Sequence, residues 1–320
     1  MATRPARKGA EGFESFYASV YGGRWPALRA ALLSPVRQVA RRNAFVGSDA
    51  SGPDCQRAHL AATKMAGCDV LVLEPGQRFR DDSSVGLRAF YIMDPASMYA
   101  AKALVTASSS EGARDPDERI LDLCAAPGGK SLILAEALGA EGRLTCNEMS
   151  DRRRARLRAV LEDYLPREVL SRVEVTGHDG AKWCLYESDA YDRILIDAPC
   201  SGERHLLENS DELKLWSPAR SKNLAVRQYA LLASAHAVLK TGGIMVYSTC
   251  SISTMENDAV VARLLKKRGQ SVRVIPVADV FANEPEALIG EATENGQMIL
   301  PDTTGFGPIY FSVLEKTALP

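Results

Sequence analysis

A regular alternation of short apolar segments and longer helical segments runs from residue 119 to the end of the chain and constrains the fold more than any other feature. Strands that alternate with helices form a parallel sheet with helices on both faces. The sequence therefore predicts an α/β fold with a mostly parallel sheet. We expect strands at 119–124, 143–146, 173–176, 192–197, 243–248, 272–277 and 308–314, and helices at 130–138, 151–165, 221–239 and 256–268.

The first third of the chain has a different pattern. Helical segments are predicted at 13–21, 25–33 and 94–104, and residues 108–116 are polar and rich in turn formers, as in a linker. A chain of 320 residues is long enough for a large α/β domain plus an appendage. We therefore expect a small helical N-terminal extension with its linker over residues 1–110, and an α/β domain over residues 111–320.

Composition excludes several classes of protein. Lys and Arg (39) balance Asp and Glu (40), so the net charge is −1 and any binding to nucleic acid must use local basic patches. The seven cysteines contain no C-x-x-C and the four histidines have no ligand spacing, which predicts neither a metal site nor a disulfide framework. No apolar run has the length of a membrane span, and no secretory signal is present. We expect an intracellular reducing compartment, and the basic residues 1–8 leave mitochondrion and cytoplasm both open.

A glycine loop follows the first predicted strand of the α/β domain, where a parallel sheet binds its ligands. Gly128 and Gly129 permit a tight turn and a close approach of backbone to a ligand. A phosphate-binding P-loop is one alternative, since Gly129-Lys-Ser131 fits its end, but Cys124 stands where the first glycine is needed. An adenosine-bearing cofactor is the other alternative and predicts an acid about 20 residues beyond the glycines.

Two acids stand where that second alternative requires them. Glu148 follows the second strand, and Asp179-Gly180 follows the third. Because the loops after three successive strands carry suitable residues, the pattern favours an adenosine-bearing cofactor over a P-loop nucleotide.

Two thiols follow the next two strands, Cys200 after 192–197 and Cys250 after 243–248. A cysteine is often only a small buried hydrophobe. Two cysteines beside a cofactor loop favour a role as nucleophile, since a free thiol is reactive even when only a few per cent of the molecules are ionised. Ser253-x-x-Glu256 has the pattern of a capping box and predicts a helix start whose dipole would favour the thiolate of Cys250.

Three loops together resemble a known family. Leu121–Lys130, Asp197–Cys200 and Ser248–Cys250 are similar to the signature loops of the Sun-domain (Fmu-type) RNA cytosine-5 methyltransferases, and the resemblance covers roughly residues 85–315. Within that family, the branch that acts on mitochondrial ribosomal RNA is the most similar. The residues that carry this second resemblance are Met93-Asp94, 179–183, Arg204-His205 and 306–311, together with the short N-terminal part.

The resemblance implies a Rossmann-like, S-adenosylmethionine-dependent RNA methyltransferase that forms 5-methylcytosine. It implies that Cys250 attacks carbon 6 of cytosine, that Cys200 assists release, and that Asp197 and Lys130 hold the base. In DNA cytosine-5 enzymes the Pro-Cys thiol, here Cys200, is instead the nucleophile. The implied cofactor-binding residues are Gly128, Gly129, Lys130, Glu148, Arg153, Asp179, Gly180 and Asp197. Glu148 is expected at the ribose, where the family more often has aspartate, Asp179 at the adenine, and Arg153 near the adenosine end.

The resemblance makes ribosomal RNA the expected substrate and leaves three alternatives open. The same chemistry could act on transfer RNA, the chain could assist ribosome biogenesis with dispensable methylation, or it could be a P-loop enzyme. A partner protein or the assembling ribosome is expected to supply part of the RNA affinity, because net charge is near zero. Basic residues at 152–158 and 266–268, and in a weaker group at 37–64, are candidates for RNA contacts or for solvated surface.

Overall fold

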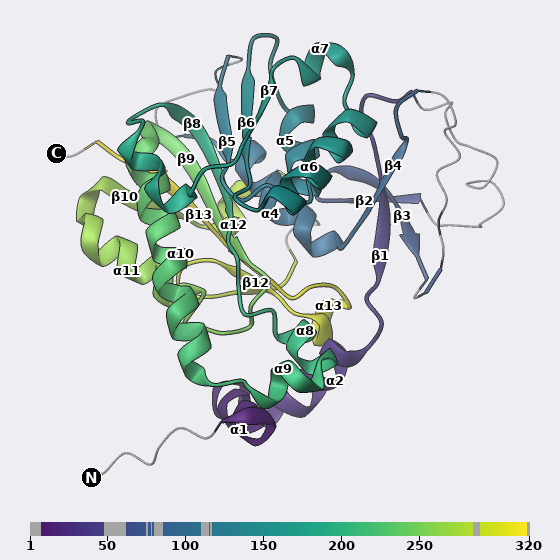
Figure 1. Ribbon diagram of the computed structural model, residues 1–320, viewed down its shortest axis with the longest axis vertical. Helices are drawn as coiled ribbons and strands as arrows, with labels where there is room; N and C mark the ends of the chain where they lie inside the picture. Colours follow the sequence, from purple (N-terminus) through teal and green to yellow (C-terminus); the bar gives the residue numbers. More distant parts are fainter. Residues whose placement is uncertain are drawn as a thin grey trace.

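A computed structural model describes residues 8–47, 62–74, 76–77, 79, 86–109, 115, 117–283 and 289–318. Most of the predicted linker at 108–116, Cys55 and the basic start of the chain lie outside these residues. The described part folds as a large sheet covered by helices, a small second sheet, and a group of helices below them (Figure 1). None of the helices in these ranges is long and apolar enough to cross a membrane.

The described residues form a nine-stranded sheet in the order β11-β12-β13-β9-β8-β5-β6-β7, with β10 paired to β13. The pairs from β7 to β9 are parallel, and the pairs made by β10 to β13 are antiparallel. The parallel half confirms the predicted α/β fold, and the C-terminal strands make the sheet mixed. Its strands are β5 (Arg119–Asp122), β6 (Arg143–Asn147), β7 (Val173–Thr176), β8 (Tyr191–Asp197), β9 (Leu239–Thr249), β10 (Val272–Ile275), β11 (Glu291–Ala292), β12 (Gln297–Ile299) and β13 (Ile309–Lys316).

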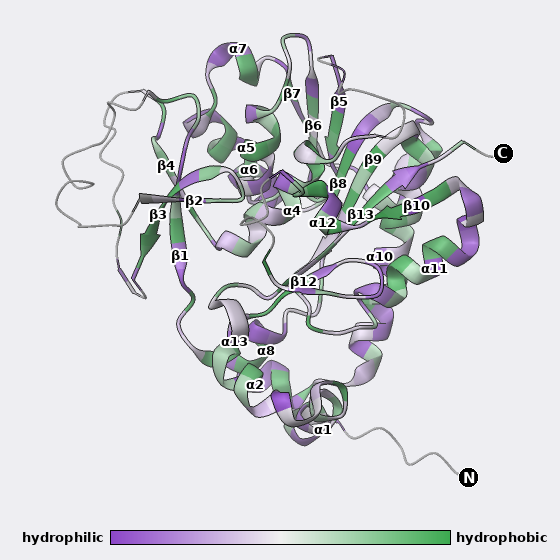
Figure 2. Cartoon of the chain, turned by 180° about the vertical axis from the view of Figure 1, so that it is seen from behind, coloured by the Kyte–Doolittle hydropathy of each residue, from purple (hydrophilic) through white to green (hydrophobic). Residues whose placement is uncertain are grey.

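Helices lie on both faces of this sheet, as the sequence predicts. Alternate residues of β8 enter different cores: Leu195 packs with α4 and α5, whereas Ile194 and Ile196 pack with α10 and α11. Figure 2 shows hydrophobic residues concentrated on the central strands. The helices of this region are α4 (Pro95–Thr106), α5 (Gly129–Glu136), α6 (Asp151–Tyr164), α7 (Arg167–Leu170), η2 (Gly180–Leu185), α10 (Pro218–Val238), α11 (Asp258–Arg268), η3 (Gly269–Ser271) and α12 (Val277–Val280).

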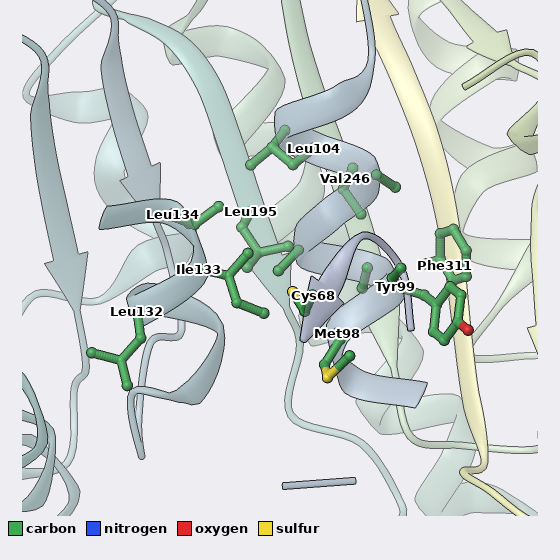
Figure 3. Packing of buried hydrophobic residues seen from close by; sticks show 14 of the residues in the cluster. Cys68, Met98, Tyr99, Leu104, Leu132, Ile133, Leu134, Leu195, Val246 and Phe311 are labelled. Atoms are coloured by element: carbon green, nitrogen blue, oxygen red, sulfur yellow. The ribbon is translucent and has the colours of Figure 1, made fainter. Parts of the chain in front are cut away.

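Helix α4 packs across the middle of the sheet. Its side chains Met98, Tyr99 and Leu104 lie against residues of β8, β9 and β13, beside Leu132, Ile133 and Leu134 of α5 (Figure 3). Asp94 caps the helix by accepting a hydrogen bond from the Ala96 N–H (2.8 Å). Cys68 of the small sheet joins the same core, which connects the N-terminal region to the large sheet.

A second sheet in the N-terminal region was not predicted. Strands β1 (Gln38–Arg42), β2 (Ala62–Met65), β3 (Cys68–Leu73) and β4 (Phe90–Met93) pair antiparallel in the order β2-β3-β1-β4. The predicted helices are present as α1 (Gly9–Tyr21), α2 (Trp25–Leu33) and α4, with the turn η1 (Gly22–Arg24) between the first two. The extension is therefore not helical throughout, because cross-strand pairing and a buried ion pair stabilise strands that their own sequence signals weakly.

That ion pair joins β1 to α5. The Nη1 atom of Arg41 lies 2.7 Å from the Glu136 carboxylate, and the Arg41 side chain is only 1% exposed. A charge this deep needs a partner, so the pair fixes the small sheet against the large one.

The lowest group of helices in Figure 1 brings the N-terminus against the middle of the chain. The aromatic rings of Phe13 and Tyr17 in α1 pack on the fully buried Trp216, and the Gly9 N–H donates to the Trp216 carbonyl (2.8 Å). The other helices here are α8 (Glu203–Glu208), α9 (Ser210–Lys214) and α13 (Pro301–Thr304). This packing places α1 directly behind the loops that follow β8 and β9.

Candidate active site

The loop between β5 and α5 forms the floor of the candidate site. Gly128 has φ of +119°, in a region that side chains with a Cβ rarely adopt, and it begins α5 as the N-cap residue. A Cβ at Gly129 would stand 2.6 Å from the Tyr91 ring of β4. Both glycines are thus required by local geometry, one by the turn and the other by packing of the small sheet.

A cavity of about 230 Å³ opens beside this loop. Lys130, Asp197, Asp122 and Cys124 line it from the large sheet. From the N-terminal side it is lined by Tyr91, Ile92, Met93 and Ser97, and Arg156 of α6 completes the lining. The cavity therefore lies between the glycine loop and the N-terminal region, and it contains two of the predicted catalytic residues.

Lys130 and Asp197 form an ion pair in this cavity, with 2.7 Å between Nζ and Oδ2. The Ser248 hydroxyl donates to the other oxygen, Oδ1, at 2.9 Å. Burial opposes the charge on Lys130, but the charges on Asp197, Asp122 and Cys250 outweigh it, so that its pKa is raised. Lys130 thus remains a cation beside the Cys250 sulfur.

Cys200 and Cys250 lie side by side, as their positions after adjacent strands predict. Cys250 is exposed and Cys200 is partly buried. A hydrogen bond with Cys250, together with burial and the charges on Cys250, Glu203 and Glu256, raises the pKa of the Cys200 thiol. Cys200 is therefore a protonated thiol that can donate to the Cys250 sulfur.

The capping box predicted after Cys250 is wrong. Helix α11 begins at Asp258, and the Ser253 hydroxyl has no hydrogen-bond partner in the part of the chain that the structure describes. The Glu256 carboxylate turns away from this helix and accepts from the Ser201 N–H (2.9 Å) and the Gln228 amide (2.9 Å). Because the helix starts several residues beyond Cys250, its dipole is not the feature that would favour the thiolate.

Glu148 lies at the end of β6, as predicted, and is almost fully buried. One of its oxygens accepts from the Ser150 N–H (2.9 Å), and the other lies 3.3 Å from Nη1 of Arg153. Arg153 also donates to the Ala126 carbonyl (2.8 Å) in the glycine loop. The predicted ribose and adenosine residues are thus brought together beside the cavity.

Asp179 lies at the end of β7 and accepts from the Ala181 N–H (3.1 Å) and from Arg227 of α10. The hydrogen bond from Arg227 lowers the pKa of Asp179. Gly180 is buried, and a Cβ there would come within about 3.0 Å of Leu123 and Leu231. Arg227 is a neighbour that sequence reasoning missed, since only the packing of α10 across the sheet brings it to Asp179.

Asp122 is a second residue that sequence reasoning missed, although it stands within the glycine-loop motif. Its Oδ2 accepts from Ser131 (2.7 Å), and the backbone N–H of Cys124 also donates to this carboxyl group. Burial, reinforced by the charge on Asp197, raises its pKa to about 7. A buried carboxyl group that lines the cavity, with acids at the ends of β6 and β7, fits a cofactor that carries an amino group and an adenosine.

The Cys124 thiol lies close enough to the glycine loop and to the predicted catalytic residues to be affected by the charges of both. Burial raises the pKa of this thiol, and so do the charges on Asp122, Asp197 and Glu148. No group of three or more His, Cys, Asp or Glu side chains in the described ranges could hold a metal ion. The site therefore presents a cation, carboxylates and thiols to a ligand.

Comparison with known proteins agrees with this site. Residues 113–315 match the family model described as 16S rRNA methyltransferase RsmB/F. The chain is 31% identical to 5-cytosine rRNA methyltransferase NSUN4 of Bos taurus, over 94% of this chain and 86% of that one. It is 34% identical to tRNA (cytosine(34)-C(5))-methyltransferase, mitochondrial, of Danio rerio, over 72% and 61% respectively.

A solved structure has the same fold. The crystal structure of a methyltransferase homolog protein from Pyrococcus horikoshii superposes with a TM-score of 0.71 at 23% identity, over 95% of this chain and 94% of that one. Fold and site together define an S-adenosylmethionine-dependent methyltransferase. The chain belongs to the 16S rRNA methyltransferase RsmB/F family. The predicted resemblance to the Sun-domain RNA cytosine-5 methyltransferases, and to their mitochondrial ribosomal-RNA branch, is thereby confirmed.

Residues that suggested this branch from the sequence meet in space. The Asp94 carboxylate accepts from the Gly307 N–H (3.1 Å), and Nη2 of Arg204 donates to the Gly307 carbonyl (2.9 Å). These three residues are far apart in sequence, so the motif marks a contact between α4, α8 and the turn before β13.

The raised pKa of Asp122 predicts a specific dependence of stability on pH. The folded state keeps this proton up to about pH 7, whereas the unfolded chain releases it near 3.8, the ordinary pKa of an aspartate. Stability should therefore fall as pH rises between these values, by at most ~4 kcal/mol. Asp122→Asn cannot ionise, so its free energy of unfolding in urea should fall less across this range. Asp117→Asn, at an exposed position, is the control; equal pH slopes for all three proteins would contradict the prediction.

Proposed function

We propose that this enzyme forms 5-methylcytosine in ribosomal RNA through a covalent bond between Cys250 and the target cytosine. The observation that carries the proposal is that the parallel strands β8 and β9 lead directly into the Cys200 and Cys250 loops, beside the Lys130–Asp197 pair. A lone cysteine after a strand has many explanations, but two thiols on adjacent loops next to a buried cation form a reacting group.

Cys250 is the nucleophile in this proposal because it is the more exposed thiol and faces the Lys130 cation. After its proton has passed to solvent, the thiolate sulfur adds to carbon 6 of cytosine, and the electrons of the 5,6 double bond become available at carbon 5. Asp197 and Lys130 line the cavity where the base would lie, so that Asp197 can hold the edge at ring nitrogen 3. S-adenosylmethionine, when bound, supplies the methyl group that carbon 5 takes.

Cys200 serves release. After methylation the carbon 5 proton passes to a base at the site, the carbon–sulfur bond breaks, and the Cys250 thiolate departs. A protonated Cys200 beside it donates a hydrogen bond to the departing sulfur and lowers the cost of its negative charge. The raised pKa of Cys200 supports this role, since it keeps the proton available at neutral pH.

The cofactor would lie along the glycine loop and the ends of β6 and β7. Gly128, Gly129 and Lys130 would pass the methionine part, Glu148 would bind the ribose hydroxyls, and Asp179 with Gly180 would face the adenine. Arg153 would approach the adenosine end, and Asp197 would contact the cofactor near the base. The proximity of Arg153 to Glu148 and of Glu148 to Cys124 supports a single continuous site.

Ribosomal RNA is favoured over transfer RNA as the substrate because the relative that aligns over nearly the whole chain is an rRNA enzyme. The transfer-RNA relative aligns over a smaller share and remains the second candidate. A ribosome-assembly role can coexist with methylation. The P-loop alternative loses support because Lys130 pairs with Asp197 rather than standing free for a phosphate. An intracellular reducing compartment fits the six described cysteines, all of which are free.

The proposed role of Glu148 predicts a loss of cofactor affinity. Glu148→Ala removes hydrogen bonds to the ribose from a charged acceptor, which is worth roughly 1–3 kcal/mol. Titration calorimetry with S-adenosylmethionine measures the effect directly. Glu141→Ala, an exposed position in the same region, should bind as the wild type does. Unchanged affinity of the Glu148 variant would remove this residue from the site.

The proposed roles of the two thiols predict opposite behaviour of their variants. Cys250→Ala should abolish methylation and form no covalent RNA adduct. Cys200→Ala should still attack but release slowly, so that a protein–RNA band survives a denaturing gel. The double variant should give no band, and Cys184→Ala, at an exposed cysteine, serves as the control. An adduct in Cys250→Ala would make Cys200 the nucleophile. If no variant forms an adduct, both cysteines have only a structural role.

The near-neutral net charge of the chain predicts that the isolated protein binds protein-free RNA with low affinity. Binding of a short RNA should fall with salt as a few phosphate contacts are lost, about one logarithmic unit per contact for each tenfold rise in salt. Filter binding at several salt concentrations measures this slope. A partner protein or the assembling ribosome would then supply the remaining affinity; tight binding of the isolated chain that is insensitive to salt would exclude that need.

A further inference from the structure

Behind the two thiols lie two carboxyl groups that the proposed chemistry does not use. Glu203 at the start of α8 and Glu256 before α11 are both fully buried. The Ser201 hydroxyl stands between them, 2.5 Å from Oε1 of Glu256 and in hydrogen-bond contact with Oε1 of Glu203. We call these three side chains the carboxyl bridge.

The carboxyl bridge holds a shared proton. One serine hydroxyl has a single proton to donate, yet it contacts an oxygen of both carboxyl groups. If both groups were ionised, one of these short contacts would join two acceptors. One carboxyl group must therefore donate a proton to the serine oxygen. Burial, together with the charge on Glu256, raises the pKa of Glu203, so Glu203 is the group that keeps this proton.

The carboxyl bridge connects the two loops that carry the thiols. Ser201 follows Cys200 directly, and its N–H donates to Glu256 (2.9 Å). On the other side, Glu203 accepts from the Ser251 hydroxyl (3.1 Å) and the Ile252 N–H (3.1 Å), next to Cys250. The Ser201 and Ser251 hydroxyls are also 3.1 Å apart. The two loops are thus hydrogen-bonded through Ser201 and Ser251, the residues that directly follow Cys200 and Cys250.

Helix α1 closes the network from the N-terminal region. The Tyr17 hydroxyl donates to Glu203 (2.6 Å), and the Tyr21 hydroxyl donates to the Ile252 carbonyl (2.7 Å). Among the described residues, the titratable groups that face the carboxyl bridge are Tyr17 and Tyr21 from α1, Tyr247 from β9, and the Cys200 thiol. A second carboxylate charge among these groups would oppose a thiolate, so the shared proton also limits repulsion.

We propose that the carboxyl bridge is a positioning device that holds the Cys200 and Cys250 thiols in contact, with Tyr17 of α1 as its outer support. This inference rests on the proposed function, since it gives the contact its purpose: Cys200 can assist release only if its sulfur stays beside that of Cys250. Glu203, Glu256 and Ser201 act through the thiols and touch neither RNA nor cofactor.

The rate of disulfide formation between the two thiols tests this position without RNA. Diamide takes two electrons and two protons from a thiol pair in contact and is reduced to its hydrazine, leaving a disulfide that peptide mass spectrometry locates at 200–250. Ser201→Ala removes the bridge and should slow this reaction about 10-fold, because the effective concentration of one thiol at the other falls. Tyr17→Phe should slow it less. Glu256→Gln should slow it less than Ser201→Ala does, because its amide has the same size and its oxygen can still accept from Ser201.

Ser253→Ala is the matched control, since Ser253 is buried in the same loop and its hydroxyl has no hydrogen-bond partner among the described residues. It should leave the rate unchanged. In every variant the fully buried Cys146 should stay unmodified and S-adenosylmethionine should still bind, which separates lost positioning from a loosened fold. Breakdown of the covalent RNA adduct, followed on a denaturing gel, should slow in parallel with disulfide formation in Ser201→Ala.

Two outcomes separate this inference from the proposed function. If Ser201→Ala forms the 200–250 disulfide as fast as the wild type, the positioning role is wrong even when methylation proceeds through Cys250. If Ser201→Ala slows the disulfide but the Cys200→Ala enzyme forms no RNA adduct, the positioning role stands and the proposed covalent mechanism fails.

Discussion

The parallel register between β8 and β9 is the constraint on which the candidate site depends. Asp197 lies opposite Ser248 in this pair, and their side chains are hydrogen-bonded at 2.9 Å. Because both strands run in the same direction and end together, the loops that follow them leave the sheet side by side. Cys200 and Cys250 are consequently neighbours, although 50 residues of chain separate them. A slip of this register would move one thiol away from the other and turn Asp197 to the opposite face.

The N-terminal region contributes to the site from two directions. Tyr91 of β4 lies over the glycine loop and lines the cavity, while Tyr17 of α1 reaches the buried carboxyl group behind the thiols. Arg41 and Glu136 fix the small sheet to α5. The N-terminal region thus forms part of the wall of the site, and the positions of the catalytic loops depend on its packing.

The sequence predicted those features that depend on local chain direction. Apolar segments followed by loops with Gly128, Glu148, Asp179, Cys200 and Cys250 located one edge of the sheet, because the carboxyl ends of parallel strands meet there. Features that depend on distant partners were missed. The pattern of Ser253 and Glu256 is that of a capping box, but a buried contact with Ser201 draws Glu256 elsewhere. Strands β1 to β4 are short, and their stability comes from pairing with each other and from the Arg41 ion pair.

The close approach of Tyr91 to Gly129 has a consequence for modularity. An added Cβ at residue 129 would collide with a ring that belongs to the small sheet, not with a ligand. The glycine loop that would hold the cofactor is therefore also a contact surface between the small N-terminal sheet and the large sheet. Exchanging the N-terminal part for one from a distant relative would leave a gap over Gly129 or a clash, unless the replacement carries a flat ring at the same place. The N-terminal part and the glycine loop can therefore be exchanged between relatives only together.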